Sequence, residues 1–316
     1  MSTAVLRRLV AVAPTLLVVG SVAFLITHTL PGDPAAVMLG PEATPAQIAS
    51  LRAELALDRP LGQRYLAWIG ELARGDLGTS IHHDRPVNAL LLERVVPTLQ
   101  LAMAALLVAV AVGVPAGILA SRRPGTMLDR TITLLATSAT AVAGFFLAML
   151  LILLFAVQLG WLPAGGSVPL RTDPVAHLQS MVLPALALGL PLAGIPARVL
   201  RGTLLDQVGA DHIVVARAKG MTHRHVLLRH ELRTALVPTA TVLGTSFADL
   251  LGGAVIVETV CNLPGLGQLL AISIGQRDLL VIQGVILAAA ALHVIVTLAV
   301  DLLVSGLDPR VDHVRF

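Results

Sequence analysis

The chain alternates between long apolar stretches and shorter segments that hold most of its charged residues. Six stretches are long enough to cross about 30 Å of hydrocarbon as helices. They lie at residues 9–29, 97–120, 132–158, 179–200, 238–260 and 281–304. The fourth is the weakest because Pro184, Pro191 and Pro196 interrupt it, although a packed membrane bundle tolerates proline. The pattern predicts an all-α integral membrane protein with six transmembrane helices.

Composition agrees with a membrane protein and excludes a water-soluble fold. Hydrophobic residues make up 56% of the chain and charged residues 13%, whereas soluble domains carry about 25% charged residues. The first apolar run follows Arg7 and Arg8 as in a secretory signal, but it extends from Leu9 to Leu30 without a small-residue cleavage pattern. We therefore expect a retained first span, and one membrane domain over residues 1–316.

The distribution of arginine and lysine predicts the orientation. If the N-terminus is inside, only Arg171 and Arg277 fall in short outer loops, while the basic residues of the other short loops fall in cytoplasmic segments. Cytoplasmic loops are enriched in Arg and Lys. We expect both termini in the cytoplasm, which places 31–95 outside and 206–238 inside.

The outer segment 31–95 has the pattern of a small helical cap. Thr44, Pro45 and Gln47 have the spacing of an N-terminal capping box. A second helix is predicted where Tyr65 and Trp68 recur at helical spacing with leucines, an arrangement that indicates packing or an interfacial anchor.

The cytoplasmic segment 206–238 has the pattern of two short helices rather than a linker. Residues 208–219 suit a helix, and Gly220 suits the left-handed position that ends one. Thr222 can cap a second helix, which Pro238 is expected to follow. A basic amphipathic loop of this kind also fits a simpler role, in which it fixes topology and contacts anionic lipid.

The spacing of residues in this loop resembles the EAA loop of bacterial ABC importer permeases. The match runs from Ala216 to Gly220, continues at His230 and ends at Pro238. In that family the loop forms coupling helices that sit in a groove of the ATPase subunit. The resemblance assigns ATPase coupling to Ala216, Arg217, Ala218, Lys219, Gly220, His230 and Pro238.

Further segments, in the same order as in the family, resemble its peptide, nickel and glutathione importer branch. They are LPGDP at 30–34, LALDRPLGQRYLAW at 55–68, GDLGTS at 75–80, ERVVPTLQL at 93–101, LGWLPAGG at 159–166, GGAVIVETVCNLPGLG at 252–267 and LDPR at 307–310. One departure lies in the third span. There Ser138 to Val142 lacks the proline of the branch's Ser-x-Pro-x-Phe turn, which leaves open whether this span is kinked.

The resemblance implies a permease subunit in the bacterial cytoplasmic membrane that imports di- or oligopeptides by alternating access. Nickel, glutathione and haem are alternative cargoes. The implied partners are a second homologous permease, two ABC ATPase subunits, an extracytoplasmic substrate-binding protein and membrane lipid. We expect no cofactor, no resident metal and no nucleic-acid partner.

The chain lacks the motif that an ATPase needs. Lys219 is its only lysine and stands between Ala218 and Gly220, so no standard phosphate-binding loop ending in Gly-Lys-Ser/Thr can form. We therefore expect that this chain is not itself an enzyme and that partner subunits hydrolyse ATP.

Ionisable residues in or near the apolar spans are candidates for a translocation pathway. They are Asp249, His293 and Glu258, although Glu258 lies near a span end and can simply reach water. Two rival functions use them. An ion-coupled secondary transporter would use Asp249 and Glu258, and a membrane-embedded enzyme would use His293. A histidine that only bonds a neighbouring helix is the structural alternative.

Overall fold

The computed structural model describes residues 14–26, 34–40, 42–54, 58–80 and 82–307, and helices dominate them. Two compact units divide the chain. The first comprises Met1–Thr98 and Pro264–Leu292, and the second comprises Leu99–Leu263 and His293–Phe316. Two of the boundaries between the units fall within continuous helices, Val87–Arg122 and Leu279–Leu307. That residues 1–316 form a single membrane domain stays a prediction.

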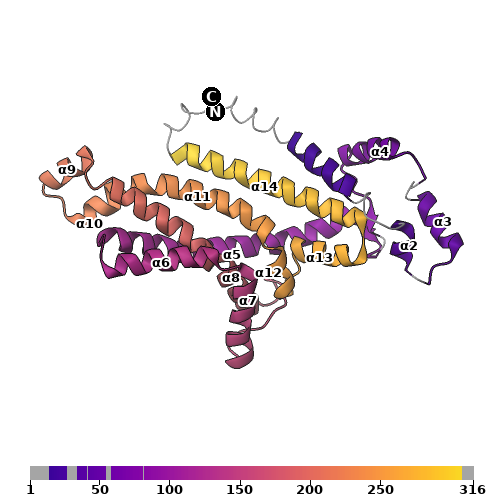
Figure 1. Cartoon of the computed structure of the whole chain (residues 1–316), viewed down its shortest axis with the longest axis horizontal. Coiled ribbons are helices and arrows are strands. Elements are labelled where there is room, and N and C mark those ends of the chain that lie inside the picture. The colour runs from indigo at the N-terminus through magenta and orange to yellow at the C-terminus, as the bar shows by residue number, and fades with distance from the viewer. Residues whose placement is uncertain (1–13, 27–33, 41, 55–57, 81, 308–316) are drawn as a thin grey trace. The chain divides into compact units, whose positions relative to one another are not determined.

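The first unit combines short helices with one small hairpin (Figure 1). It holds the helix Pro14–Ile26, α2 (Pro34–Leu39), α3 (Pro45–Glu54), α4 (Leu61–Ala73), β1 (Thr79–Ser80), β2 (Arg85–Pro86), α13 (Leu266–Gln276) and the first parts of α5 (Val87–Arg122) and α14 (Leu279–Leu307). The expectation of helices alone therefore needs a small correction, because β1 and β2 pair antiparallel with Thr79 opposite Pro86.

The second unit carries the longer helices (Figure 1). Besides the remainders of α5 and α14, it holds α6 (Met127–Ala141), α7 (Gly144–Leu151), the π-helix η1 (Ile152–Gln158), α8 (Pro174–Asp206), α9 (Asp211–Ala218), α10 (His223–Val226), the π-helix η2 (Leu227–Glu231), α11 (Leu232–Gly253) and α12 (Val255–Val260). Its core joins α5, α7, α8 and α12 through residues such as Leu101, Ala148, Leu188 and Val257.

Four helices in the described residues are long and apolar enough to cross a membrane, or five spans if one bent pair counts as a span. The four are Val87–Arg122, Pro174–Asp206, Arg224–Gly253 and Leu279–Leu302. The predicted count of six is therefore not confirmed. Of the first predicted span only Pro14–Ile26 is described as a helix, and its remaining residues lie outside the described ranges.

The third predicted span is sharply bent although it has no proline at the bend. The axes of Met127–Ala141 and Gly144–Gln158 differ by 101°, which Figure 1 shows as α7 turning away from α6. Val142 and Ala143 are extended, with ψ of 123° and 129°. A Cβ on Gly144 would lie 3.4 Å from the Ala187 carbonyl oxygen of α8, so close packing accompanies the turn. The third predicted span is therefore kinked, which answers the question that its missing proline left open.

The span with three prolines forms one long helix, α8, and it is the most buried of the four. Its N-cap Asp173 accepts hydrogen bonds from the N–H groups of Val175 and Ala176 at 2.9 and 3.0 Å. In its most apolar stretch of 18 residues, 56% of the residues are buried. The prolines therefore lie in a helix that is packed among its neighbours, the setting in which membrane helices tolerate proline.

Glycines in α8 allow neighbouring backbones to approach closely. A Cβ on Gly194 would lie 2.1 Å from the Ala136 carbonyl oxygen of α6, far inside van der Waals contact, whereas a Cβ on Gly202 would meet nothing within 4 Å. We expect Gly194→Ala to destabilise the protein by about 1–3 kcal/mol through overpacking. Gly202→Ala is the matched control and is expected to be neutral or slightly stabilising. Thermal unfolding of both variants in detergent measures the difference, and equal midpoints would contradict the packing argument.

The predicted features of the outer segment are present in the first unit. The Thr44 N–H donates to Gln47 Oε1 at 2.9 Å, and the Gln47 N–H donates to Thr44 Oγ1 at 3.4 Å, which confirms the capping box. Tyr65 and Trp68 of α4 each lie 5.4 Å from the Phe24 ring. The aromatic residues therefore pack against the helix Pro14–Ile26.

A buried hydrogen bond links the hairpin to the start of α14 in the first unit. Ser80 and Asp278 are fully buried, and Ser80 Oγ donates to Asp278 Oδ2 at 2.6 Å. The other oxygen of Asp278 accepts from the Val281 N–H at 3.3 Å, at the first turn of α14. One carboxylate thus fixes the hairpin and caps a helix.

Candidate functional site

The segment between α8 and α11 forms a compact helical surface at one end of the second unit (Figure 1). α9 ends in a Schellman motif, in which the Met221 N–H bonds the Ala216 carbonyl oxygen at 3.3 Å. Gly220 has φ +78°, which confirms the predicted left-handed conformation. No heavy atom lies within 4 Å of the position a Cβ would take, so backbone conformation rather than space favours glycine here.

Buried apolar residues hold α9 to the chain that follows it. Ile213 and Ala216 of α9 pack with Val226 of α10. The next residue, Leu227, packs on Leu200 and Leu204 at the end of α8. The consecutive residues Val226 of α10 and Leu227 of η2 therefore connect α9 to the end of α8 through buried apolar contacts.

The second predicted helix of the loop is not a separate element. The chain runs without a break from α10 through η2 into α11. Together, residues Arg224–Gly253 form one helix that is long and apolar enough to cross a membrane. Pro238 lies inside α11, so the expectation that it follows a helix end is wrong. Proline removes one backbone donor, and an already nucleated helix can continue through it when its other hydrogen bonds remain. The predicted fifth span accordingly starts earlier and breaks at Ala254 before α12.

The outer face of the segment combines exposed apolar and basic side chains. Val214 and Val215 of α9 are each about half exposed, at 54% and 51%. Beside them in sequence, α10 and η2 form a shallow depression lined by Thr222, Arg224, His225, Leu228 and Arg229. A surface of this composition suits a protein partner with an acidic rim.

The structure places the remaining predicted coupling residues around this surface. Ala216 is buried, Ala218 and Lys219 are exposed, and the side chain of Arg217 lies outside the described part of the structure. His230 is half-buried, with its ring centroid 6.4 Å from that of His225. These residues share one segment, and their role in coupling stays a prediction.

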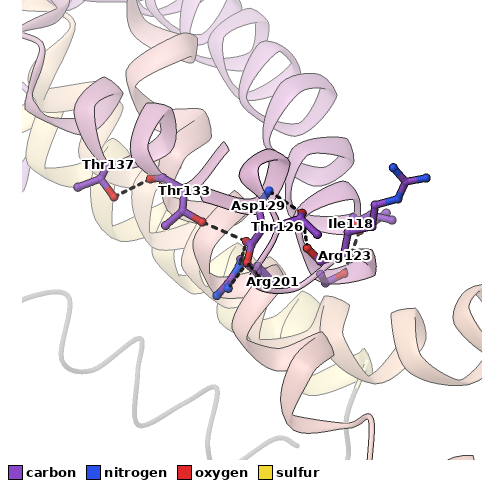
Figure 2. A network of polar contacts seen from close by, with 9 residues as sticks. Ile118, Arg123, Thr126, Asp129, Thr133, Thr137 and Arg201 are labelled. Carbon is purple, nitrogen blue, oxygen red and sulfur yellow. Dashed lines mark hydrogen bonds and ion pairs between the residues drawn. The ribbon is translucent and has the colours of Figure 1, made fainter. Parts of the chain in front are cut away.

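An ion pair that the sequence analysis did not identify lies next to the loop, between α6 and α8 (Figure 2). Arg201 donates to both carboxylate oxygens of Asp129, through Nε and through Nη2, the latter at 2.8 Å. The Asp129 side chain is 4% exposed and that of Arg201 is 29% exposed. Bidentate geometry makes such pairs strong and directional.

Further hydrogen bonds hold the Asp129 carboxylate in place. The Gly125 N–H donates to Oδ2 at 2.9 Å, and Thr133 Oγ1 donates to Oδ1 at 3.4 Å. Thr126 caps α6 and accepts from the Asp129 N–H at 3.5 Å. The spacing of Thr126 and Asp129 was a detectable capping signal, but nothing in the sequence indicated Arg201 as the partner.

The three pathway candidates lie in different surroundings. Asp249 is exposed on α11. His293 Nδ1 lies 3.1 Å from the Ala248 carbonyl oxygen and so donates to a neighbouring helix, as the structural alternative predicted. Glu258 is 1% exposed, which contradicts the expectation that it reaches water, because α12 packs into the core of the second unit through Val257.

Comparison with known proteins places this architecture. A model of the binding-protein-dependent transport system inner membrane component family matches residues 113–313, and the N-terminal model of such components matches residues 1–102. In an inward-facing structure of the MetNI methionine ABC transporter, one chain shares the fold with a TM-score of 0.55 at 22% identity, covering 69% of this chain and 96% of that chain.

Curated relatives match over nearly the full length of both chains. A probable peptide ABC transporter permease protein, y4tP of Sinorhizobium fredii, is 37% identical over 99% of this chain and 100% of its own. The glutathione transport system permease protein GsiC of Escherichia coli K12 is 39% identical over 98% of each. The chain is therefore a multi-pass inner-membrane permease component of ABC transporters and belongs to the binding-protein-dependent transport system inner membrane component family.

Proposed function

We propose that this chain is the permease subunit of an ATP-driven importer that moves di- and oligopeptides across the bacterial cytoplasmic membrane. Six spans place both termini and the loop 206–238 in the cytoplasm. A homologous second permease completes the pathway, two ABC ATPases dock below it, and an extracytoplasmic binding protein delivers cargo.

The surface formed by α9, α10 and η2 is the observation that carries this proposal. It presents exposed valines and a basic depression, and a Schellman motif at Gly220 defines its geometry. It lies in the segment 206–238, whose residues Ala216 to Gly220 and His230 resemble the EAA loop. An acidic, partly apolar groove on an ATPase is a complementary partner.

Transmission follows from the packing. When ATP binding closes the two ATPases, force on α9 and α10 passes through Val226 and Leu227 to α8. Rigid helices respond to such force by tilting rather than by bending, which exposes the pathway alternately to either side of the membrane. The Asp129–Arg201 pair then moves α6 together with α8.

Peptides are the proposed cargo because the relatives named above are described as peptide and glutathione transport components. Glutathione is itself a small peptide with two carboxylates and one amine, so it is the first alternative, ahead of nickel chelates and haem. Uptake of a labelled dipeptide and of labelled glutathione by the same complex distinguishes the two.

The docking part of the proposal is tested by charge reversal. Arg224→Glu combined with Arg229→Glu is expected to lower copurification of the ATPases at least tenfold and to stop uptake, because both arginines line the exposed depression. Arg171→Glu, exposed in a predicted outer loop, is the matched control and should change neither. Undiminished ATPase binding by the double variant would refute docking at this surface.

The secondary-transporter alternative gives the opposite result in a simpler system. If the proposed function is correct, liposomes that contain only this chain and an ion gradient should accumulate no peptide. Accumulation without ATPases, lost on Asp249→Asn, would replace the ATP-driven proposal by ion coupling.

A further inference from the structure

An apolar cavity of about 300 Å³ lies between α5, α6 and α8, which is at the lower end of the usual size of ligand pockets. All its lining residues are apolar or glycine; among them are Val112 and Ala116 of α5, Ile132 and Leu135 of α6, and Gly194 of α8. Leu135 is 63% exposed, so the cavity opens to the outside of the second unit rather than into its core.

A second depression lies at the turn 123–126, which joins α5 to α6. It is lined by Leu119, Arg122, Arg123 and Leu128. Both arginines are exposed, and Leu119 and Leu128 are 49% and 41% exposed. This depression therefore places two cations beside two accessible leucines.

Helical spacing joins the two depressions into one groove. Three lining residues of α5, Val112, Ala116 and Leu119, and Arg123 directly after the helix follow one another at intervals of four, three and four. On α6, residues 128, 132, 135 and 139 repeat the same intervals. Such spacing places residues on one helix face, so a single stripe on each helix leads from the apolar cavity to the arginines.

Arg122 and Arg123, at the end of the groove, are not neutralised by Asp129 in the first turn of α6. Both oxygens of Asp129 accept hydrogen bonds from Arg201. In Figure 2 the Arg123 side chain extends away from the Asp129 network. The end of the groove therefore has a net positive charge.

We propose that this groove binds an anionic phospholipid, such as phosphatidylglycerol, from the membrane leaflet at the α5–α6 turn. Arg122 and Arg123 bind the phosphate, and one acyl chain lies along Leu119 and Leu128 into the cavity. A helix of another protein would fill the apolar part but would leave two arginines without a counter-charge, whereas an anionic lipid matches both parts. The inference needs only the membrane location of the chain and not the peptide cargo.

Lipid retention by the purified full-length permease, with whatever partners it retains, is the test. After reconstitution in mixed phosphatidylglycerol and phosphatidylcholine and mild detergent extraction, native mass spectrometry counts bound phosphatidylglycerol. We expect Arg122→Gln with Arg123→Gln to weaken retention roughly thirtyfold, the effect of losing two membrane-surface cations. The control is Arg130→Gln, an exposed arginine outside the groove, which should retain wild-type binding. Equal retention by both variants would overturn the proposal.

A second measurement identifies what occupies the apolar part. Cys261 is the only cysteine; it is 1% exposed, and burial raises its pKa to about 11, so it stays unreactive near neutral pH. In Leu135→Cys the new thiol is therefore labelled selectively. We expect it to crosslink to a phosphatidylglycerol with a thiol-reactive acyl chain, and less so in the Arg122/Arg123 variant. If a bifunctional thiol-reactive reagent instead joins this thiol efficiently to a second protein chain, protein covers the groove and lipid binding there is refuted.

Discussion

Gly220→Val is expected to abolish ATP-driven peptide uptake while the permease still reaches the membrane. Gly220 has φ +78° and ends α9, and a β-branched residue there is strained by about 1–3 kcal/mol. The chain can relieve this strain only by changing the angle between α9 and α10, which alters the proposed docking surface. Uptake of labelled peptide in cells, together with membrane abundance, measures the result.

Gly209→Val is the matched control for this substitution. Gly209 lies in the same loop, has no positive φ, and like Gly220 has no heavy atom within 4 Å of the Cβ position. The added side chain is identical, so only backbone conformation differs. Wild-type uptake by Gly220→Val, or equal loss in both variants, would show that the left-handed turn is not needed for coupling.

Asp129→Asn is expected to cost about 2–3 kcal/mol of folding free energy, because it weakens the charge-assisted hydrogen bonds to Arg201, whose side chain is partly accessible to water. The Asp129 side chain is 4% exposed, so water cannot fully replace the lost interaction. Thermal unfolding in detergent should show a lowered midpoint, and uptake should fall because α6 and α8 lose their link.

Two comparisons make the ion-pair prediction specific. Arg85 and Glu93 form an exposed pair, with side chains 46% and 55% exposed, so Arg85→Gln should change stability by no more than about 1 kcal/mol. Combining Asp129→Asn with Arg201→Gln removes both charges and should recover most of the loss. A double variant as unstable as the sum of its single changes would mean that the two residues act independently.

Local signals in the sequence predicted local structure correctly. The capping box at Thr44 and the left-handed Gly220 depend on residues within a few positions of one another, and their physics needs no distant partner. The EAA-like spacing was sufficient to identify the candidate surface, because the residues of that surface lie in one continuous segment.

Predictions that depended on distant packing were less successful. Pro238 was expected after a helix and lies inside one, since continuation through a proline depends on the surrounding helix. The bend before Gly144 occurs without proline, where α7 packs on Ala187 and Leu188. Glu258 was expected near water and is buried, because α12 packs into the core of the second unit.

The sequence by itself determined that this chain is an α-helical membrane protein, where its apolar stretches lie, and which loop resembles a coupling segment. Hydropathy and turn chemistry decide these features within one helix length. Only the tertiary structure decided the pairing of Asp129 with Arg201, the bend of the third span and the groove between α5 and α6. These depend on which helix faces are neighbours, and contacts between residues far apart in the chain leave no periodic pattern in either segment alone.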